Sequence, residues 1–282
     1  MSDERLNRRG LLGGIAVGLG ALLGGCDRVT DNKTGRKVLF SANDLTYRVQ
    51  RFLLRSDNLA REYSEADITP HFRANGTYDP PDKDYRALAR GNFVDWRLTV
   101  DGLVTTPLKL SLTDLRALPS RTQITRHDCV EGWSCIGKWT GTPLFEVLAR
   151  AGVKPQAKYA VFYCADSMDG LSDAGSIDPA DDQAAPEQAN DAAAAGSNAV
   201  RYYESLDLRD AVHPQTILAY AMNDKPLPVP YGAPLRLRVE RQLGYKMAKY
   251  LMRIELVDDF SGIGDGNGGY WEDLGYDWFA GI

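Results

Sequence analysis

Alternating hydrophobic and polar positions predict several β-strands along the chain. In Trp96–Val100 every second residue is apolar, which predicts a strand that ends at the Asp101-Gly102 turn. The apolar runs at 159–163 and 250–257 are typical of further strands. A second alternation places Leu235, Leu237 and Val239 between Arg236, Arg238 and Glu240. It predicts a strand with one charged face and one core face.

Helix signals occur between these strands. Ser111 and Asp114 are spaced like a capping box, so we expect a helix to begin there and to stop at Pro119. A second helix is expected to have Thr142 as its N-cap, Pro143 at its first position and Gly152 after its last turn. Strands and helices mix without regular βαβ alternation, so we predict an α+β fold of mixed sheets with short helices.

Two stretches lack such a pattern. Residues 173–200 are mostly Ala, Asp, Gln, Asn and Pro, without an aromatic residue. They cannot bury enough apolar area to offset their ordering entropy, so we predict a disordered insertion. After Phe260 the chain is rich in glycine and aromatic residues but has no period. We expect this tail to lie over the domain as an aromatic strap.

Composition restricts the class of protein. The 282 residues are 44% hydrophobic and 25% charged, which suits one globular unit or at most two. The net charge is -5 and no basic cluster is present, so nucleic acid is not an expected partner. No glycine-rich phosphate loop follows an expected strand, which argues against a nucleotide enzyme.

The N-terminus has the features of an export signal. Arg8-Arg9 precede an apolar run that ends at Leu23, and residues 23–26 read Leu-Gly-Gly-Cys. We interpret residues 1–25 as a twin-arginine signal with a lipobox, so that acylated Cys26 anchors the protein on the periplasmic side of the bacterial inner membrane. A plain signal peptide or an uncleaved anchor is the alternative. Residues 26–67 would form a linker with a short helix around Leu45–Leu54, and 68–282 the main folded domain with the insertion at 173–200.

The remaining cysteines are 129, 135 and 164. Cys129 closes an extended stretch and follows Arg126 and His127, whose charges would lower a thiol pKa and favour a thiolate that binds a metal. It could instead be a small buried hydrophobic residue, or form a disulfide with Cys135. The chain has three histidines and no Cys-x-x-Cys, so zinc and haem signatures are absent.

A series of motifs decides between these readings. In order they are Cys129-Val-Glu-Gly-Trp-Ser, Trp139-Thr-Gly-Thr-Pro-Leu, Tyr202-Tyr-Glu-Ser-Leu, His213-Pro and Tyr231-Gly-Ala-Pro-Leu-Arg. From about Ala74 to Asp259 the chain resembles the sulfite oxidase superfamily of molybdopterin enzymes. The bacterial branch with the periplasmic protein-methionine-sulfoxide reductase catalytic subunit is the most similar.

The resemblance implies a molybdenum-molybdopterin cofactor with Cys129 as catalytic residue and protein ligand to molybdenum. It implies that the pterin and its phosphate are bound by Asn75, Arg236, Lys246 and Lys249. Two positions depart from the family. Tyr231 stands where an asparagine is common, and Cys164 stands where the methionine-sulfoxide branch has a threonine, so each changes the hydrogen bonds available to the cofactor.

The expected activity is reduction of an S-oxide or N-oxide. Sulfite oxidases have an arginine shortly after the ligand cysteine, but residues 130–134 include no cation, and Glu131 would repel a dianion. Trp133 and Trp139 suggest a wall for a neutral or apolar substrate, such as a small molecule or methionine sulfoxide. Electrons would come from a quinol, a membrane cytochrome or a c-type cytochrome, and we expect a monomer. The alternatives are sulfite-type oxidation, a non-catalytic lipoprotein of this fold, or a thiol-redox protein using Cys129 and Cys135.

Overall fold

The computed structural model describes residues 45–53, 58–167 and 200–282. The chain divides into two units, Met1–Leu54 and Arg55–Ile282. In the first unit residues 45–53 are helical, as expected. The export signal with Cys26, and all of the 173–200 insertion except Val200, lie outside the described residues. In the described ranges we find no helix with the length and apolar character that a membrane crossing requires.

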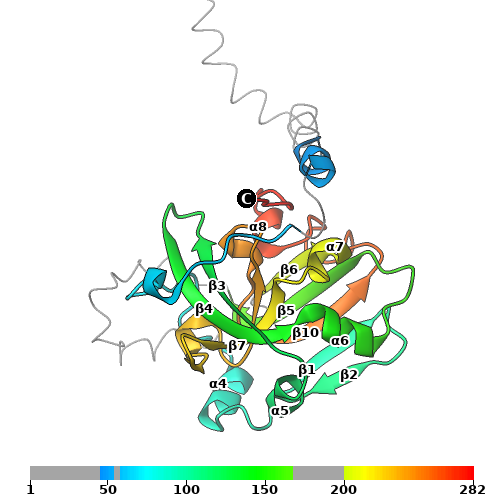
Figure 1. Ribbon diagram of the computed structural model, residues 1–282. Coiled ribbons are helices and arrows are strands. Elements are labelled where there is room, and N and C mark those ends of the chain that lie inside the picture. Colours follow the sequence, from blue (N-terminus) through cyan, green and yellow to red (C-terminus); the bar gives the residue numbers. More distant parts are fainter. Residues whose placement is uncertain (1–44, 54–57, 168–199) are drawn as a thin grey trace, which may run out of the picture. The chain divides into compact units, whose positions relative to one another are not determined.

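The first sheet of the second unit has five strands in the order β2-β1-β10-β5-β6 (Figure 1). Their bounds are β1 Leu98–Gly102, β2 Leu108–Leu110, β5 Tyr159–Ser167, β6 Arg201–Asp207 and β10 Leu251–Val257. Strands β1 and β10 are parallel, and the other neighbours are antiparallel. The strands expected at 96–100, 159–163 and 250–257 are therefore present, with shifted or extended ends.

The second sheet is antiparallel throughout. It has the order β3-β4-β7-β8, and β9 also pairs with β7. The bounds are β3 Arg121–Asp128, β4 Ser134–Pro143, β7 Thr216–Met222, β8 Lys225–Pro226 and β9 Arg236–Val239. The long β3–β4 hairpin ends in the loop 129–133, which carries Cys129.

The helices of this unit are short. They are α4 Lys83–Arg90, α5 Leu112–Arg116, α6 Leu144–Ala151, α7 Leu208–Ala211 and α8 Tyr270–Asp273, with 3-10 turns η1 Glu65–Asp67, η4 Val229–Tyr231 and η5 Gly244–Lys246. Mixed sheets with few short helices make the fold α+β, as the sequence predicts. The capping box of α5 is formed as expected, with the Ser111 side chain accepting from the Asp114 backbone N–H.

The expected start of α6 was wrong by one residue. Pro143 is the N-cap, not the first helical residue, because Thr142 and Pro143 still pair with β7 as the end of β4. The Thr142 hydroxyl donates to the Leu115 carbonyl at 2.8 Å, so it ties β4 to α5 and does not cap a helix. Gly152 ends α6 with φ +66°, where a side chain would be strained.

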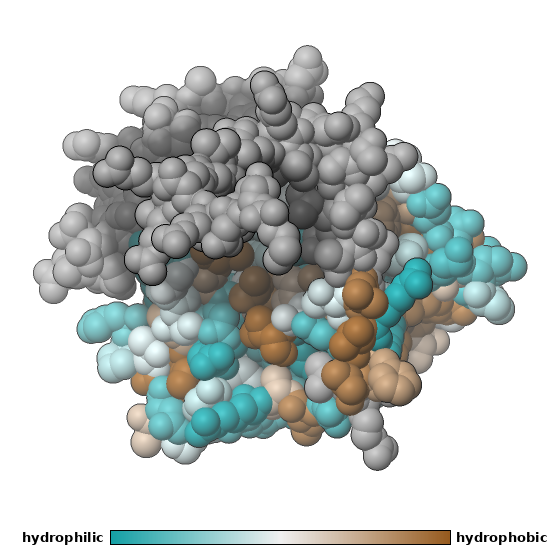
Figure 2. Space-filling view, turned by 90° about the horizontal axis from the view of Figure 1, so that it is seen from above, coloured by the Kyte–Doolittle hydropathy of each residue, from teal (hydrophilic) through white to brown (hydrophobic). Residues whose placement is uncertain are grey.

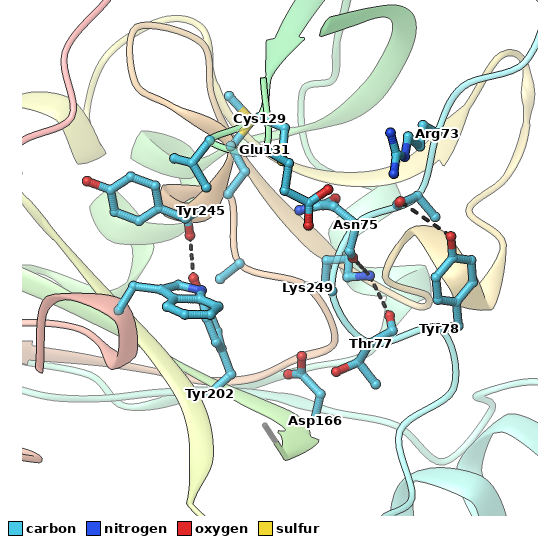
Figure 3. A pocket seen from close by; sticks show the side chains of 17 residues that line it. Arg73, Asn75, Thr77, Tyr78, Cys129, Glu131, Asp166, Tyr202, Tyr245 and Lys249 are labelled. Atoms are coloured by element: carbon cyan, nitrogen blue, oxygen red, sulfur yellow. Dashed lines mark hydrogen bonds between the residues drawn. The ribbon is translucent and has the colours of Figure 1, made fainter. Parts of the chain in front are cut away.

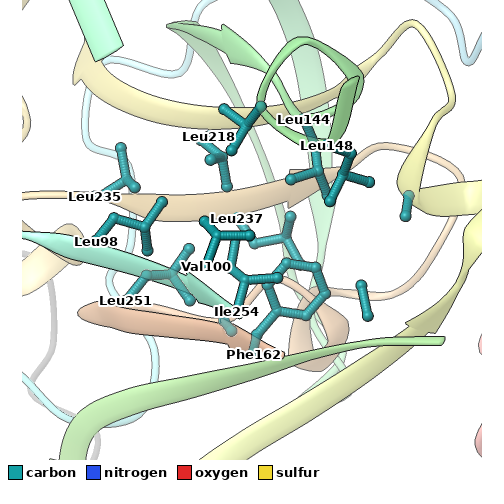
Figure 4. Close-up of a cluster of buried hydrophobic side chains, with 14 of the residues drawn as sticks. Leu98, Val100, Leu144, Leu148, Phe162, Leu218, Leu235, Leu237, Leu251 and Ile254 are labelled. Atoms are coloured by element: carbon teal, nitrogen blue, oxygen red, sulfur yellow. The ribbon is translucent and has the colours of Figure 1, made fainter. Parts of the chain in front are cut away.

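The main hydrophobic core lies between the two sheets (Figure 4). Its buried members include Leu98 and Val100 of β1, Phe162 of β5, Ile254 of β10, Leu218 of β7, Leu237 of β9, and Leu144 and Leu148 of α6. A smaller cluster packs on the other face of β7 through Ile217 and Ala219. Strand β7 is therefore buried on both faces, which gives the second sheet a rigid centre.

Strand β9 is also buried on both faces. Its apolar residues enter the main core, as expected, but the charged face is buried as well. Arg236 and Arg238 lie over the ring of buried Trp139, at 5.0 and 4.3 Å from its centroid. Glu240 pairs with Arg238 at 2.6 Å. The sequence pattern correctly separates the two faces, yet it does not distinguish a buried charged face from a solvated one.

Candidate functional site

A cavity of about 260 Å³ lies where several loops meet at the edges of the two sheets (Figure 3). Three of its segments are the loop 73–78, the tip of the β3–β4 hairpin and the η5 turn with the residues after it. Strands β5 and β6 and helix α8 each add one side chain. These last three are Asp166, Tyr202 and Trp271.

Cys129 lines one end of the cavity. It immediately follows β3, and its loop is closed by two backbone hydrogen bonds, from Cys129 N–H to Trp133 O at 2.9 Å and from Gly132 N–H to Cys129 O at 3.1 Å. The thiol is partly exposed to the cavity. Cys129, Cys135 and Cys164 are free thiols in this structure, so the disulfide alternative is not formed here.

The surroundings do not lower the thiol pKa as we expected from Arg126 and His127. Arg126 donates to the Asp128 carboxylate at 2.9 Å, and burial holds the pKa of His127 well below its usual value, so its imidazole is neutral. Burial raises the pKa of Cys129, and the charge of Glu131 adds to the rise although Arg73 opposes it. The free thiol is therefore protonated near neutral pH, and a metal would have to displace its proton.

Lys249 lines the same cavity and is more buried than Cys129 (Figure 3). Its ammonium donates to the carbonyl oxygens of Asn75 at 2.6 Å, Thr77 at 2.5 Å and Pro230 at 3.0 Å. Burial, followed by the charge of Arg236, lowers the pKa of Lys249 to about 7. Among the described residues, the positive charge of buried Lys249 is thus bound by neutral carbonyl oxygens and not by a carboxylate.

Asp166 faces the same end of the cavity from the end of β5. Burial raises the pKa of its carboxyl to about 6, while Lys249 opposes the rise. Within the described residues, Asp166 Oδ1 is buried without a hydrogen-bond partner. A buried polar atom left without a partner costs free energy, which a bound group with N–H donors would recover.

The cavity therefore fits a group with two chemically different ends. Cys129 offers a soft sulfur ligand at one end, and Lys249 and Asp166 offer a positive charge and a hydrogen-bond acceptor at the other. Gly244 forms part of the wall, and its backbone approaches His127 so closely that a Cβ would lie 2.5 Å from the ring. A side chain at that position would narrow the cavity or displace the hairpin.

The expected site residues fall into two groups. Asn75, Cys129 and Lys249 line the cavity. The remaining four are buried or partly buried behind its wall: Cys164, Tyr231, Arg236 and Lys246. Cys164 is 2% exposed on β5, and Tyr231 donates its hydroxyl to Phe72 O at 2.7 Å. Tyr231 thus holds the loop that carries Asn75.

Arg236 supports the cavity from behind. It is 1% exposed, so it is not a solvated strand arginine, and it donates to the carbonyls of Tyr231 at 3.0 Å and Met247 at 3.2 Å. Its Nε atom is buried and has no hydrogen-bond partner among the described residues. Arg236 therefore joins the η4 turn to the segment that leads to Lys249.

Lys246 is the clearest departure from the expected phosphate site. Its ammonium is buried and bound by the carboxylates of Glu204 and Glu272, both at 2.5 Å. It joins strand β6 to helix α8 and does not line the cavity. The three-residue spacing from Lys249 gave no indication of this, because Glu272 comes from a distant segment.

The expected aromatic wall is also formed by other residues. Trp139 is fully buried beneath the β9 arginines, and Trp133 does not line the cavity. Tyr202, Tyr245 and Trp271 form the aromatic surface instead. Tyr202 belongs to the Tyr202-Tyr-Glu-Ser-Leu motif, whereas no sequence motif indicated that Trp271 lines a site.

No cationic residue follows Cys129 closely in sequence, but a cation from another segment lies in the same cavity. Arg73 lines the cavity, and its guanidinium lies over the Trp133 ring at 5.4 Å. The Trp133 Nε1–H in turn donates to Glu131 at 2.8 Å, and Glu131 lines the cavity, as the electrostatic argument supposed. The mouth near Cys129 therefore has one charge of each sign.

Comparison with known proteins gives three findings. A family model described as an oxidoreductase molybdopterin binding domain matches residues 87–183 and 171–262. A putative protein-methionine-sulfoxide reductase subunit YedZ1 from Azospira oryzae is 35% identical over 276 residues, 98% of this chain and 86% of that protein. The sulfane dehydrogenase SoxCD from Paracoccus pantotrophus is 22% identical with a TM-score of 0.45, over 59% of this chain and 39% of that one.

A further relative is matched over a shorter stretch. The protein-methionine-sulfoxide reductase catalytic subunit MsrP of Xanthomonas axonopodis pv. citri is 37% identical over 164 residues, which is 58% of this chain and 45% of that protein. Less than half of that relative is therefore included in the match.

The pKa of Lys249 makes anion binding depend on pH in a definite direction. Below about pH 7 Lys249 is charged, and below about pH 6 Asp166 is neutral, so both changes favour an anion at lower pH. We expect sulfate to raise the melting temperature of the cofactor-free protein by a few degrees more at about pH 6 than at about pH 8.5.

Sulfate is the suitable probe because its own charge is constant over this range. The Lys249→Met variant should lose the pH-dependent part of the shift, while Lys154→Met, which removes an exposed lysine, should keep it. Equal shifts at both pH values in the wild-type protein would contradict the assignment of Lys249 as the anion-binding cation.

Proposed function

Because the chain belongs to the family of oxidoreductases with a molybdopterin-binding domain, we propose that it reduces an S-oxide or N-oxide, with methionine sulfoxide as the candidate substrate. The family identifies it as an enzyme that depends on a molybdenum-molybdopterin cofactor. When bound, that cofactor supplies two-electron oxygen-atom transfer. The non-catalytic alternative is therefore set aside.

The observation that carries the proposal is that Cys129 and Lys249 line one cavity. Cys129 would bind the molybdenum through its sulfur after losing its proton. Lys249 would hold the anionic end of the pterin through its positive charge, with the charge of buried Arg236 behind it. Asn75 and Asp166 would bind polar atoms of the pterin. The described residues thus fit the cofactor, although Lys246 is excluded from that set.

The mouth of the cavity favours a neutral polar substrate. Arg73 can donate to the oxygen of an S-oxide, and Glu131 balances its charge. Tyr245 and Trp271 offer apolar surface to the groups beside the sulfur. Reduction takes up two electrons and two protons, breaks the S–O bond, and releases a thioether and water.

The names of the relatives support methionine sulfoxide among such substrates. Two of them are described as subunits of a protein-methionine-sulfoxide reductase. A subunit needs a counterpart, and we propose a membrane cytochrome, a quinol or a c-type cytochrome as the electron source. We further propose export by the twin-arginine route, with Cys26 as the lipid anchor on the periplasmic side.

Sulfite-type oxidation is the second candidate because Arg73 lines the cavity near Cys129. An arginine there could bind an oxyanion in the way that the sequence after Cys129 cannot. Glu131 at the same mouth would weaken that binding, which is why we place the neutral substrate first.

Replacing the proposed metal ligand should show that the function of Cys129 differs from that of the other cysteines. We expect Cys129→Ser to lower turnover by more than about 100-fold, since loss of a direct ligand should exceed the loss of an outer partner. Its sulfur-to-metal charge-transfer absorption should change as well. Cys135→Ser is the control, because Cys135 is a buried free thiol six residues away in sequence. A Cys129→Ser enzyme with wild-type spectrum and turnover would refute the assignment.

Steady-state kinetics decide the substrate class. With a reduced viologen as donor, we expect turnover of methionine sulfoxide or trimethylamine N-oxide, and little oxidation of sulfite with an artificial acceptor. The physical reason is that Glu131 opposes a dianion at the mouth, whereas it does not oppose a neutral oxide. Efficient sulfite oxidation without oxide reduction would reverse the order of the two candidates.

The export proposal is tested on the precursor. Changing Arg8 and Arg9 to lysine should leave the precursor in the cytoplasm, because the twin-arginine route reads the arginine pair. Mass spectrometry of the wild-type mature protein should find an acylated N-terminal Cys26. An unmodified N-terminus at another residue would rule out the lipid anchor but not the export route.

A further inference from the structure

The C-terminal segment 258–282, here called the strap, is strongly acidic. It contains six carboxylates and neither lysine nor arginine. The acidic residues are Asp258, Asp259, Asp265, Glu272, Asp273 and Asp277. Asp258, Asp259, Asp265 and Asp277 are exposed, and exposed charges of one sign attract molecules of the opposite sign and speed their encounter.

The strap is fixed on the domain by buried contacts. Glu272 of α8 binds Lys246, and the Tyr203 hydroxyl donates to Asp273. Farther along, the Leu243 N–H donates to Ala280 O at 2.9 Å. These contacts come from different elements of the domain, so the strap has one defined position over the cavity wall, as the aromatic tail in the sequence predicts.

A run of aromatic rings in contact joins the cavity to the exposed part of the strap. Trp271 lines the cavity, and its ring centroid lies 5.3 Å from that of Tyr276, which is 37% exposed. The Tyr276 ring lies equally close to that of Tyr245, another cavity residue, at 5.3 Å. Leu274, at 63% exposure, stands beside Tyr276 in sequence and adds apolar surface. The cavity and the outer surface are therefore about one aromatic layer apart at this point.

Electrons must cross the protein surface to reach the cavity. The sequence has no Cys-x-x-Cys-His motif and only three cysteines after Cys26, so the chain has no haem or iron–sulfur motif of its own. Electron transfer slows steeply with distance, which favours entry where the wall is thin and continuous. At the strap only one layer of aromatic rings separates the cavity from the surface. The negative charge of the strap favours a partner with a basic surface.

We propose that the exposed tip of the strap, formed by Leu274 and Tyr276 with Asp265 beside α8, is where an electron-donating redox protein with a basic surface docks. Asp265 is placed there because its backbone N–H donates to Asp273 at 3.0 Å. The proposal rests on the reductase function above. In each turnover the partner is oxidised by one electron in each of two encounters, and the substrate oxide takes up these two electrons and two protons from water.

Figure 2 shows the molecule from above, at a right angle to the view of Figure 1. On the coloured part of this face, hydrophobic groups lie between hydrophilic ones. The tip of the strap combines both kinds of group, exposed Leu274 and Tyr276 with exposed Asp265, as a transient protein interface does.

The test uses the cofactor-loaded enzyme with mitochondrial cytochrome c, a basic haem protein, as the probe. The enzyme is reduced, freed of reductant and mixed with ferricytochrome c, and the haem absorbance gives the rate of electron exchange. The strap variant combines Asp265→Lys with Leu274→Lys. Its matched control combines Asp95→Lys with Val94→Lys, an exposed acid and an exposed apolar residue just after α4. In Figure 1, α4 lies at the opposite end of the view from α8.

We expect the rate of electron exchange with cytochrome c to fall as salt is added to the wild-type enzyme, because salt screens the attraction between opposite charges. At low salt the strap variant should be slower by on the order of tenfold, and its rate should no longer depend on salt. The control variant should keep the wild-type rate and the wild-type salt dependence. Turnover of the oxide substrate with reduced viologen should be the same in all three proteins. Reduced viologen supplies electrons without the docked protein, so this assay tests the reductase function independently of the docking surface.

Two results would overturn the proposal. One is a wild-type enzyme whose exchange with cytochrome c does not depend on salt. The other is equal slowing of the strap and control variants, which would show that general charge, and not this surface, sets the rate.

Discussion

The burial of two arginines on β9 is the constraint on which the cavity depends. Arg236 and Arg238 share one face of a strand that has no solvated side, and both lie over the ring of Trp139. Arg238 is paired with Glu240, and its guanidinium donates a hydrogen bond to Nδ1 of His127 at 3.0 Å. Arg236 binds the carbonyls of Tyr231 and Met247. A buried charge is costly without hydrogen-bond partners, so these partners cannot move independently of the arginines.

Both ends of the cavity follow from that constraint. His127 comes two residues before Cys129, so Arg238 sets the end of β3 from which the thiol loop begins. Arg236 holds the η4 turn and the segment that leads to Lys249, which lines the cavity. Replacing one arginine would leave its buried partners without hydrogen bonds, and the cost would appear at the cavity even though neither arginine lines it. Sites held in this way are specified by buried polar contacts more than by their own loops.

Much of this could be predicted from local sequence. The capping box of Ser111, the turn at Gly152 and the buried strand at 159–163 depend on residues close together in the chain, and each is present. Cys129, Asn75 and Lys249 were found through motifs, and all three line the cavity. The strands 134–143 and 201–207 were not expected as such, because their burial is set by partners far away in sequence.

The errors about Lys246 and Trp139 share one physical cause, which is contact between distant segments. Lys246 looked like a partner of Lys249 until Glu204 and Glu272 were seen to enclose it. Trp139 looked like a substrate wall, but the β9 arginines cover it. The thiol pKa was misjudged because neighbours in sequence, Arg126 and His127, are turned toward other partners. Charge and aromatic character are visible in a sequence, whereas the direction in which a side chain points is decided by the fold.

The position of Trp271 in the cavity wall has a consequence for the order of events during synthesis. Residues 73–131 are made long before α8, so the part of the cavity wall that they form can fold while Trp271 is still absent. Until Glu272 reaches Lys246, a buried ammonium lacks one of its two carboxylates. The nascent domain therefore lacks this part of the cavity wall until α8 is made. Asn75, Cys129 and Lys249, which would hold the cofactor, are all in the chain before α8 can cover that side of the cavity.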